Sequence, residues 1–312
     1  MTVAVLNDFV RQHLEGRLPE WLEPRWFTTT DELYALAPEA EIGWFDAYEI
    51  PSTHEAARRA VKLKWLNTLA AGIDPFPLDL LRERGVLMTN GAGINAITIA
   101  EYALMGMLGI AKGFRDVIRA QDRREWLHEA PGKAELYGSK ALILGAGAIG
   151  GEVARRLEAF GVEVTKVRRR PGPGELGTDD WRPRLGEFDW IVIAVPSTKA
   201  TEHLIGTAEL AAMKPTATVL NFARGAVIDQ PALVEALTAK RIGAAFLDVT
   251  DPEPLPPDHP LWGLDNAYIT MHLSGRSQTL MFRRSADRFL ANLDRWRRGE
   301  PLEHTVDLTL GY

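Results

Sequence analysis

The sequence contains no cysteine among its 312 residues. Disulfide bonds, thiol nucleophiles and cysteine-ligated zinc are therefore excluded, and a reducing compartment, the cytoplasm, is expected. A basic excess is also missing, because 36 Lys and Arg stand against 42 Asp and Glu, for a net charge of −6. We therefore expect no nucleic-acid partner.

Long apolar runs are missing too. The run from Leu104 to Ile110 is too short to span a bilayer and lies between Glu101 and Lys112, so no membrane partner is expected. The chain starts with MTVAVLNDFVRQ, which has no basic segment before an apolar run and favours a first strand over a signal peptide. No Asp or Glu cluster has the spacing of metal ligands, so no metal is expected.

One stretch, from Lys140 to Gly161, does carry a distinctive pattern. Gly145, Gly147 and Gly150 stand in G-x-G-x-x-G spacing between a short apolar run and a segment with helical spacing of its apolar residues. Such glycines allow a tight strand-to-helix turn, a close approach of the backbone to a pyrophosphate and close packing of helix on strand. The pattern predicts a dinucleotide site at a helix N-terminus, and an ordinary glycine-rich turn is the alternative.

The next strand pattern, Val162 to Val167, has an unusual end. NAD sites place an acid about 20 residues after the glycines to bind the ribose hydroxyls, but this chain has Arg168, Arg169 and Arg170 there. Guanidinium pairs with phosphate in a fork geometry, whereas a carboxylate repels a 2′-phosphate. We therefore expect NADP(H) in preference to NAD(H), discriminated by Arg168 and Arg169. A solvated basic run before the Pro171–Gly174 loop is the alternative.

Apolar runs alternate with helical patterns along the chain. This alternation predicts an α/β fold with two doubly wound, Rossmann- or flavodoxin-like parallel sheets. Strands are expected at Val3–Leu6, Glu41–Phe45, Leu63–Thr68, Val86–Thr89, Ala141–Leu144, Val162–Val167, Trp190–Val195, Thr218–Ala223, Ala244–Val249 and Ala267–Thr270. One long helix is expected from Asn95 to about Trp126. Its broad apolar stripe predicts a contribution to a homodimer interface, with ordinary core packing as the alternative.

Polar residues stand where the later strands end. Arg224 and His272 come just after two of these runs, Asp248 stands near the end of a third, and Glu253 comes shortly after Asp248. Ligands of doubly wound sheets bind outside the carboxyl ends of the strands, so we expect these four side chains near the nicotinamide. Taken singly, the arginine has an ordinary explanation as a surface ion pair and the histidine as a structural residue.

Two features of the first third of the chain also suggest a binding site. The segment Leu69–Asp74, LAAGID, has small residues after a strand, which can expose N–H groups to a carboxylate. A plain turn is the alternative there. Trp44 ends an expected strand and is assigned to a substrate pocket, with core packing as the alternative.

The segments NFARGAVID, GAAFLDVTDPEPLPPDHPLW and NAYITMHLSG, with the glycine stretch and LAAGID, resemble signature segments of the D-isomer-specific 2-hydroxyacid dehydrogenase family. Their order and spacing match from about residue 40 to Gly311 and Tyr312. The arginines after the second strand look most similar to the glyoxylate/hydroxypyruvate reductase branch. The resemblance implies an oxidoreductase that transfers hydride between NADP(H) and a small 2-keto or 2-hydroxy acid.

The resemblance also implies roles for single residues. His272 matches the acid–base histidine, Glu253 the carboxylate that hydrogen-bonds to it, and Arg224 the arginine that binds the substrate's carboxylate and carbonyl oxygen. The backbone amides of Ala71 and Gly72 match the loop that holds the same carboxylate. The implied cofactor contacts are Thr98 and Asp248 near the nicotinamide, Ala148 and Ile149 in the pyrophosphate turn, Phe222, Ala223 and Arg224 beneath the ring, and His272, Ser274 and Gly275.

By the same resemblance, the helical pattern Ser277–Arg298 returns the chain to the first domain. Residues 1–97 plus 285–312 would then form the substrate domain and residues 98–284 the dinucleotide-binding domain, with the active site in the cleft between them. Two alternatives stay open. One is a formate dehydrogenase-like enzyme, against which Glu253 argues because those enzymes carry glutamine there. The other is a nucleotide-sensing, dimeric interaction protein of the same superfamily, which keeps the same Arg, Glu and His.

Overall fold

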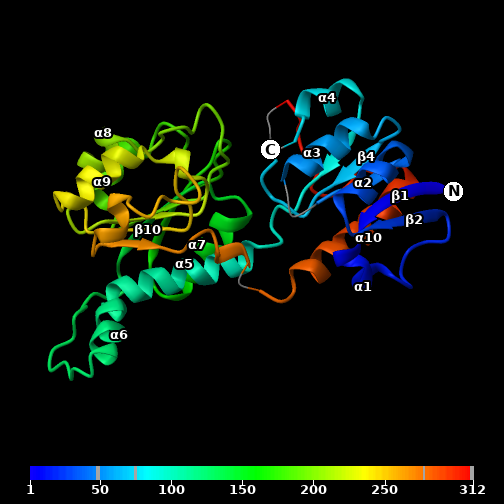
Figure 1. Ribbon diagram of the computed structural model, residues 1–312. Helices are drawn as coiled ribbons and strands as arrows, with labels where there is room; N and C mark the ends of the chain where they lie inside the picture. Colours follow the sequence, from blue (N-terminus) through cyan, green and yellow to red (C-terminus); the bar gives the residue numbers. More distant parts are fainter. Residues whose placement is uncertain (47–49, 74–75, 277, 310–312) are drawn as a thin grey trace. The chain divides into compact units, whose positions relative to one another are not determined.

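The computed structural model describes residues 1–46, 50–73, 76–276 and 278–309, and the chain divides into two compact units (Figure 1). Unit 1 comprises Met1–Asn95 and Gln278–Tyr312, and unit 2 comprises Ala96–Ser277. The chain therefore leaves unit 1, forms unit 2 and returns. It changes units after Asn95 and after Ser277, whereas the sequence analysis places these points after residues 97 and 284.

Unit 1 contains a five-stranded, all-parallel sheet in the order β2-β1-β3-β4-β5. Its strands are β1 (Thr2–Asn7), β2 (Leu22–Phe27), β3 (Ile42–Trp44), β4 (Trp65–Asn67) and β5 (Leu87–Thr89). The sequence analysis missed β2, because Glu23, Pro24 and Arg25 interrupt its apolar pattern. Proline is tolerated there because β2 is an edge strand, where one side of the backbone needs no partner.

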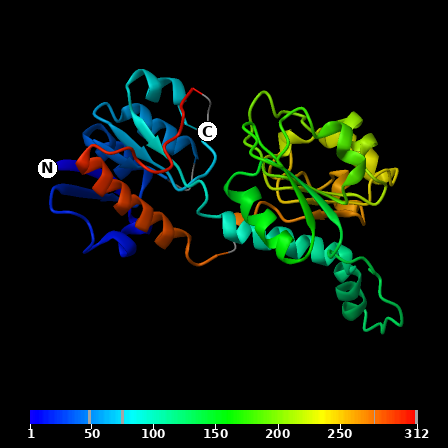
Figure 2. The same ribbon diagram turned by 180° about the vertical axis from the view of Figure 1, so that it is seen from behind.

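Helices cover both faces of this sheet. They are α1 (Arg11–Leu14), α2 (Thr30–Leu36), α3 (Ile50–Arg59), α4 (Leu78–Glu83) and α10 (Met281–Arg298). Val5 packs in the core shared with α2, α3 and α4, and Leu6 packs in the core shared with α1 and α10. Neighbouring residues of one strand thus enter opposite cores, as the alternation of strand side chains requires. Figure 2 shows α10, in orange-red, lying along unit 1.

Unit 2 contains a six-stranded, all-parallel sheet in the order β11-β10-β9-β8-β6-β7. Its strands are β6 (Lys140–Leu144), β7 (Glu163–Val167), β8 (Trp190–Ile193), β9 (Thr218–Asn221), β10 (Ala244–Leu247) and β11 (Ala267–Ile269). Helices α5 (Ala96–Ala111) and α7 (Ala148–Ala159) share a core with one face, and α8 (Thr207–Ala212) and α9 (Gln230–Thr238) with the other. The two parallel sheets confirm the predicted fold class. The direction of winding reverses between β6 and β8, the place where such sheets bind ligands.

The single helix expected from Asn95 to Trp126 is wrong. Helix α5 ends at Ala111, and α6 (Phe114–Asp122) starts after a break at which the two helices are bent by 72°. Gly113 explains the break, because its φ is 60° and a Cβ there would lie 2.7 Å from the backbone nitrogen of Gly132. Figure 1 shows α6 and the segment after it projecting from the rest of unit 2.

Among the described helices, none is by itself both long enough and apolar enough to span a membrane. Only the bent pair α5 and α6 reaches that length and apolar character when the two helices are taken together.

Candidate active site

The turn between β6 and α7 has the shape that the glycine pattern predicts. Gly145 has a φ of 88°, and a Cβ there would lie 2.7 Å from the carbonyl oxygen of Ala194, at the switch point next to β8. A Cβ on Gly150 would lie 2.3 Å from the carbonyl oxygen of Gly145. Both positions therefore require glycine. A Cβ on Gly147 would meet nothing within 4 Å, so this side of the turn is open to a ligand.

The start of α7 offers donors toward that open side. The N-cap is Gly147, which has no side chain to accept the first N–H groups of the helix. The first turn, with Ala148 and Ile149, therefore presents N–H groups that no capping side chain accepts, together with the positive end of the helix dipole. The residues present thus fit the pyrophosphate of a dinucleotide. Their contact with one stays a prediction.

The arginines after β7 have an acidic neighbour that the sequence analysis missed. Arg168 is 46% exposed, and its Nε lies 3.1 Å from Oε1 of Glu175. The other Glu175 oxygen accepts the N–H of Gly172 at 2.9 Å. The available signal in the sequence was the Pro-Gly pair before Glu175, which predicts a turn that folds the chain back toward β7. Arg169 is exposed, and its role in cofactor choice stays a prediction.

The loop after β9 fixes the backbone of Arg224. The Asn221 side chain accepts the Ala223 N–H at 3.0 Å and donates to the Arg224 carbonyl at 2.9 Å. The guanidinium Nη1 donates to the Ala223 carbonyl at 2.8 Å. A Cβ on Gly225 would lie 2.1 Å from the carbonyl carbon and oxygen of Thr250. The Arg224 loop therefore lies in direct backbone contact with the segment that leads to Glu253.

Glu253 and His272 form a pair in the structure, as the resemblance implies. The His272 Nδ1 lies 2.8 Å from Oε2 of Glu253, and Oε1 accepts the Thr250 N–H at 3.1 Å. An ionised carboxylate only accepts, so the proton of a neutral His272 lies on Nδ1 and Nε2 remains for proton exchange. The two side chains are 42% and 38% exposed, which leaves the imidazole accessible to a substrate.

The turn that carries His272 is held by Asp248. The His272 N–H donates to the Asp248 carbonyl at 2.6 Å. The buried carboxylate of Asp248 accepts the Thr270 hydroxyl at 2.7 Å, the Ser274 N–H at 3.1 Å and the Ser274 hydroxyl. These bonds support two consecutive residues with positive φ, Met271 at 53° and His272 at 56°. Asp248 and Ser274 therefore position the histidine, and their direct contact with a nicotinamide stays a prediction.

Of the other expected cofactor residues, Thr98, Phe222 and Ala223 are buried and Gly275 is half-buried. Thr98, on α5, is 5% exposed, and its hydroxyl lies 3.4 Å from the Ser274 carbonyl. Phe222 and Ala223 are each 6% exposed in the segment after β9, and Gly275 follows Ser274 directly. The structure brings these residues into unit 2 with Arg224 and His272, and their contact with a cofactor stays a prediction.

The LAAGID segment of unit 1 has some of its amides bound internally. The N–H of Leu69 donates to Asp46 Oδ2 and that of Ala70 to Thr68 Oγ1, both at 3.1 Å. Within the described ranges, the N–H groups of Ala71 and Gly72 donate no hydrogen bond to the protein. Those two amides are therefore the candidates for a substrate carboxylate. Asp74, the last residue of the motif, lies outside the described residues.

Trp44 is a correction to the sequence analysis. Its side chain is completely buried in the core that β3 shares with α10, and its ring centroid lies 5.0 Å from that of Phe289. A large aromatic side chain at the end of a short strand fills the space between sheet and helix here, so within the described part of the chain the packing alternative accounts for Trp44.

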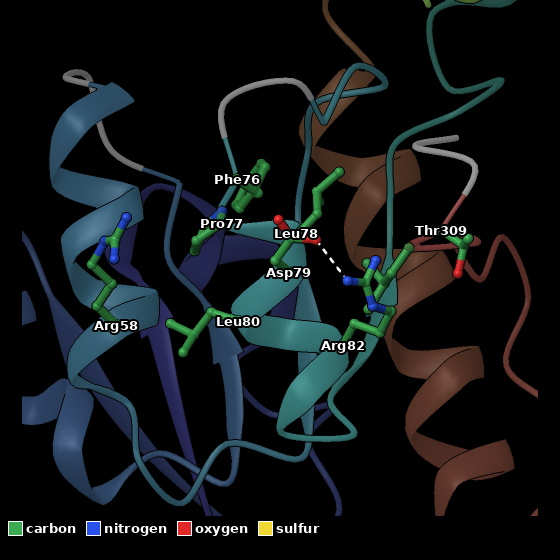
Figure 3. A pocket seen from close by; sticks show the side chains of 9 residues that line it. Arg58, Phe76, Pro77, Leu78, Asp79, Leu80, Arg82 and Thr309 are labelled. Carbon is green, nitrogen blue, oxygen red and sulfur yellow. Dashed lines mark hydrogen bonds and ion pairs between the residues drawn. The ribbon is translucent and has the colours of Figure 1, made fainter.

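A cavity of about 560 Å³ lies elsewhere in unit 1, next to α3 and α4 (Figure 3). Arg58 of α3 and Arg82 of α4 lie at its rim, and Arg82 is paired with Asp79 at 2.8 Å. None of the residues that carry the predicted chemistry lines this cavity. We assign it no part in the site.

Comparison with known proteins identifies the family of the chain. The family model described as D-isomer specific 2-hydroxyacid dehydrogenase, NAD binding domain, matches residues 104–274. Human glyoxylate reductase/hydroxypyruvate reductase is 35% identical over 258 residues, which cover 79% of this chain and 77% of the human protein. A solved D-isomer specific 2-hydroxyacid dehydrogenase family protein from Aeromonas salmonicida superposes with a TM-score of 0.86 at 30% identity, covering 98% of this chain and 99% of that one.

A third relative is longer than the chain. D-3-phosphoglycerate dehydrogenase of Methanocaldococcus jannaschii is 32% identical over 265 residues, which cover 82% of this chain and 50% of the relative. The match thus spans about half the length of that enzyme. Its name gives phosphoglycerate as the substrate, whereas the name of the human relative gives glyoxylate and hydroxypyruvate.

Proposed function

The chain belongs to the D-isomer-specific 2-hydroxyacid dehydrogenase family, and we propose that it is an NADP(H)-dependent reductase of a small 2-keto acid such as glyoxylate or hydroxypyruvate. The observation that carries the proposal is the Glu253–His272 pair beside the Arg224 loop, in the unit that contains the glycine turn. The human relative's name supports the substrate class. The name of the longer relative gives a different substrate, phosphoglycerate, so kinetics with several 2-keto acids must identify the substrate of this chain.

The protein's own groups match the charge changes of the reaction. When bound, a reduced nicotinamide supplies hydride to the keto carbon of the substrate. Arg224 binds the substrate carboxylate and stabilises the negative charge that grows on the keto oxygen. His272 gives that oxygen a proton from Nε2, and Glu253 holds the ring through Nδ1 and stabilises the imidazolium. The Ala71 and Gly72 amides are proposed to bind the same carboxylate.

Replacement of His272 or Arg224 by alanine tests these roles. Each variant is expected to lower kcat/KM for glyoxylate or hydroxypyruvate by at least about 100-fold, the size of a lost general acid or charge stabiliser. His13→Ala and Arg241→Ala serve as controls of the same residue types outside the site, and they should keep wild-type activity. NADPH binding, followed by fluorescence, shows that the variants are folded. Turnover close to wild type in either site variant contradicts the assignment.

The cofactor preference is tested separately. Arg168 and Arg169 are proposed to pair with the 2′-phosphate, so kcat/KM for NADPH should exceed that for NADH, measured with saturating keto acid. Equal values contradict the preference while leaving the reductase activity standing. Tight NADPH binding without turnover of any 2-keto acid favours the alternative of a nucleotide-sensing protein.

A homodimer and a cytoplasmic location are also part of this proposal. The partner is a second copy of the chain, which would cover α6 and the segment after it. This region exposes Phe114 (57%), Leu127 (42%) and Trp126 (86%), and residues 121–130 are all exposed. Apolar side chains gathered in this way mark contact surfaces.

A further inference from the structure

The loop after β7 brings a carboxylate next to the arginine that is proposed to select the cofactor. Arg168 Nε lies 3.1 Å from Glu175 Oε1, and the Glu175 side chain is only 18% exposed, although it lies in a surface loop. An acid at this end of a second strand is the usual mark of NAD specificity. Here the acid comes from further along the chain and contacts the arginine, so its role differs from that of the usual acid.

The loop geometry places this carboxylate independently of Arg168. The Glu175 N–H donates to the Gly172 carbonyl at 3.1 Å, and Gly174 between them has a φ of 78°, as a tight turn after Pro173 requires. The Glu175 Oε2 accepts the Gly172 N–H at 2.9 Å, which closes the same turn from the side chain. Glu175 is therefore a fixed acceptor rather than a long side chain that happens to reach an arginine.

The residue after Glu175 ties the turn back to the sheet. Leu176 forms a parallel bridge with Val167, its N–H donates to the Lys166 carbonyl at 2.8 Å, and its carbonyl accepts the Arg168 N–H at 3.0 Å. The backbone of Arg168 and the residue after Glu175 are thus hydrogen-bonded to each other at the end of β7. The backbone therefore fixes the separation of the points from which the two side chains extend.

We propose that Glu175 is a specificity-determining residue, which holds the Arg168 guanidinium by its Nε in the orientation that receives the 2′-phosphate of NADP(H). A guanidinium carries five N–H donors, so a contact at Nε leaves the Nη donors for phosphate oxygens. This inference rests on the proposed NADP(H) preference. It adds a positioning residue that acts through Arg168 and touches no cofactor atom itself.

Two effects of the carboxylate oppose each other. Its negative charge repels a 2′-phosphate, and because both groups would contact the same guanidinium they lie within the screening length of about 8 Å at physiological ionic strength, so salt does not remove this repulsion. The contact with Glu175 also holds the long arginine side chain in one orientation before the ligand binds. Binding then loses no further side-chain entropy at Arg168, which corresponds to about a 3- to 10-fold gain in affinity. The proposal requires the ordering gain to exceed this repulsion, so that the carboxylate strengthens binding of the phosphate.

The experiment measures binding by calorimetry at physiological ionic strength, with two adenosine ligands that differ in the 2′-phosphate. Adenosine 2′,5′-bisphosphate carries this group and adenosine 5′-monophosphate lacks it. Glu175→Gln and Glu175→Ala are expected to weaken the bisphosphate by about 3- to 10-fold and leave the monophosphate unchanged. Glu187→Gln, which breaks the exposed pair of Glu187 with Arg184 in the same unit, is the matched control and should change neither.

A double-mutant cycle separates positioning from a general effect on the loop. In an Arg168→Ala background, Glu175→Gln should have no further effect on the bisphosphate, because the residue through which it acts is gone. Unchanged or tighter bisphosphate binding by Glu175→Gln in the wild-type background overturns the inference, as does an equal loss in the Arg168→Ala background. Wild-type protein that binds both ligands equally overturns the NADP(H) preference itself, and the inference with it.

Discussion

Asp46 stands at the carboxyl end of β3, where it is enclosed by the start of the LAAGID segment. Its carboxylate accepts the Thr68 hydroxyl at 2.7 Å and the Leu69 N–H at 3.1 Å. Burial raises the pKa of Asp46 above its ordinary value of 3.8, against the opposing effect of these two hydrogen bonds. The folded protein therefore holds this proton more tightly than the unfolded chain does.

The raised pKa fixes the sign of a pH effect on stability. As pH rises from 3.8 to the folded pKa of Asp46, the folded state retains a proton that the unfolded state has lost, so stability falls. Asp46→Asn lacks this titration. We expect the wild type to lose free energy of unfolding relative to Asp46→Asn between pH 3.5 and pH 7, measured in urea. A difference between the two proteins that does not change with pH contradicts the raised pKa.

Single residues also show what the sequence could predict. Arg224 and His272 stand close to the ends of apolar strands, a local signal, whereas Glu253 follows further along its loop, and the roles of all three come from the family resemblance. Glu175 was missed because its importance depends on a turn that folds it back onto Arg168. Trp44 was assigned to a pocket because an aromatic residue at a strand end gives no local sign of whether a helix covers it, and α10, which covers it, comes from the other end of the chain.

Among the structural elements, the loops after β9 and β10 determine the geometry of the candidate site. Gly225 is the point of contact between them, since a Cβ there would lie 2.1 Å from the backbone of Thr250. The Thr250 N–H in turn fixes Glu253. A side chain at Gly225 has to push the two loops apart, and the Glu253–His272 pair moves with one of them.

Gly225→Ala is therefore expected to lower both stability and activity. Forcing a methyl group into closely packed backbone costs about 1–3 kcal/mol, and kcat/KM should fall by more than the loss of folded protein accounts for. Thermal unfolding and steady-state kinetics measure the two effects. Gly263→Ala is the matched control, because its Cβ would meet nothing within 4 Å. Wild-type kinetics in Gly225→Ala would mean that the contact between the loops does not set the site's geometry.

The elements also show where sequence patterns fail. Continuous apolar runs predicted the buried strands of both sheets, because parallel strands are apolar on both faces. The same logic failed for α5 and α6. Their apolar stripe continues past Gly113, whereas the helix ends at Ala111 and a new one starts at Phe114. The break depends on a close contact with Gly132, which is 19 residues further along the chain and gives no periodic signal.

At the scale of the whole molecule, the proposed dimer follows from what α6 leaves uncovered. Ala120 is buried, but Phe114, Val117 and Ile118 are 57%, 38% and 38% exposed on the same short helix. The exposed segment after it adds Trp126. A helix with so much apolar surface in water is stabilised when a second copy of the chain removes that surface from solvent, at roughly 25 cal/mol per Å² buried.

Charged substitutions on this surface test the proposal. Phe114→Glu combined with Val117→Glu is expected to shift the protein from dimer to monomer in sedimentation equilibrium, because two buried carboxylates without partners oppose association. Val61→Glu, at a 68% exposed valine of unit 1, is the matched control and should leave the assembly unchanged. A wild-type monomer, or a double variant that still forms a dimer as tightly as wild type, shows that this surface holds no second copy.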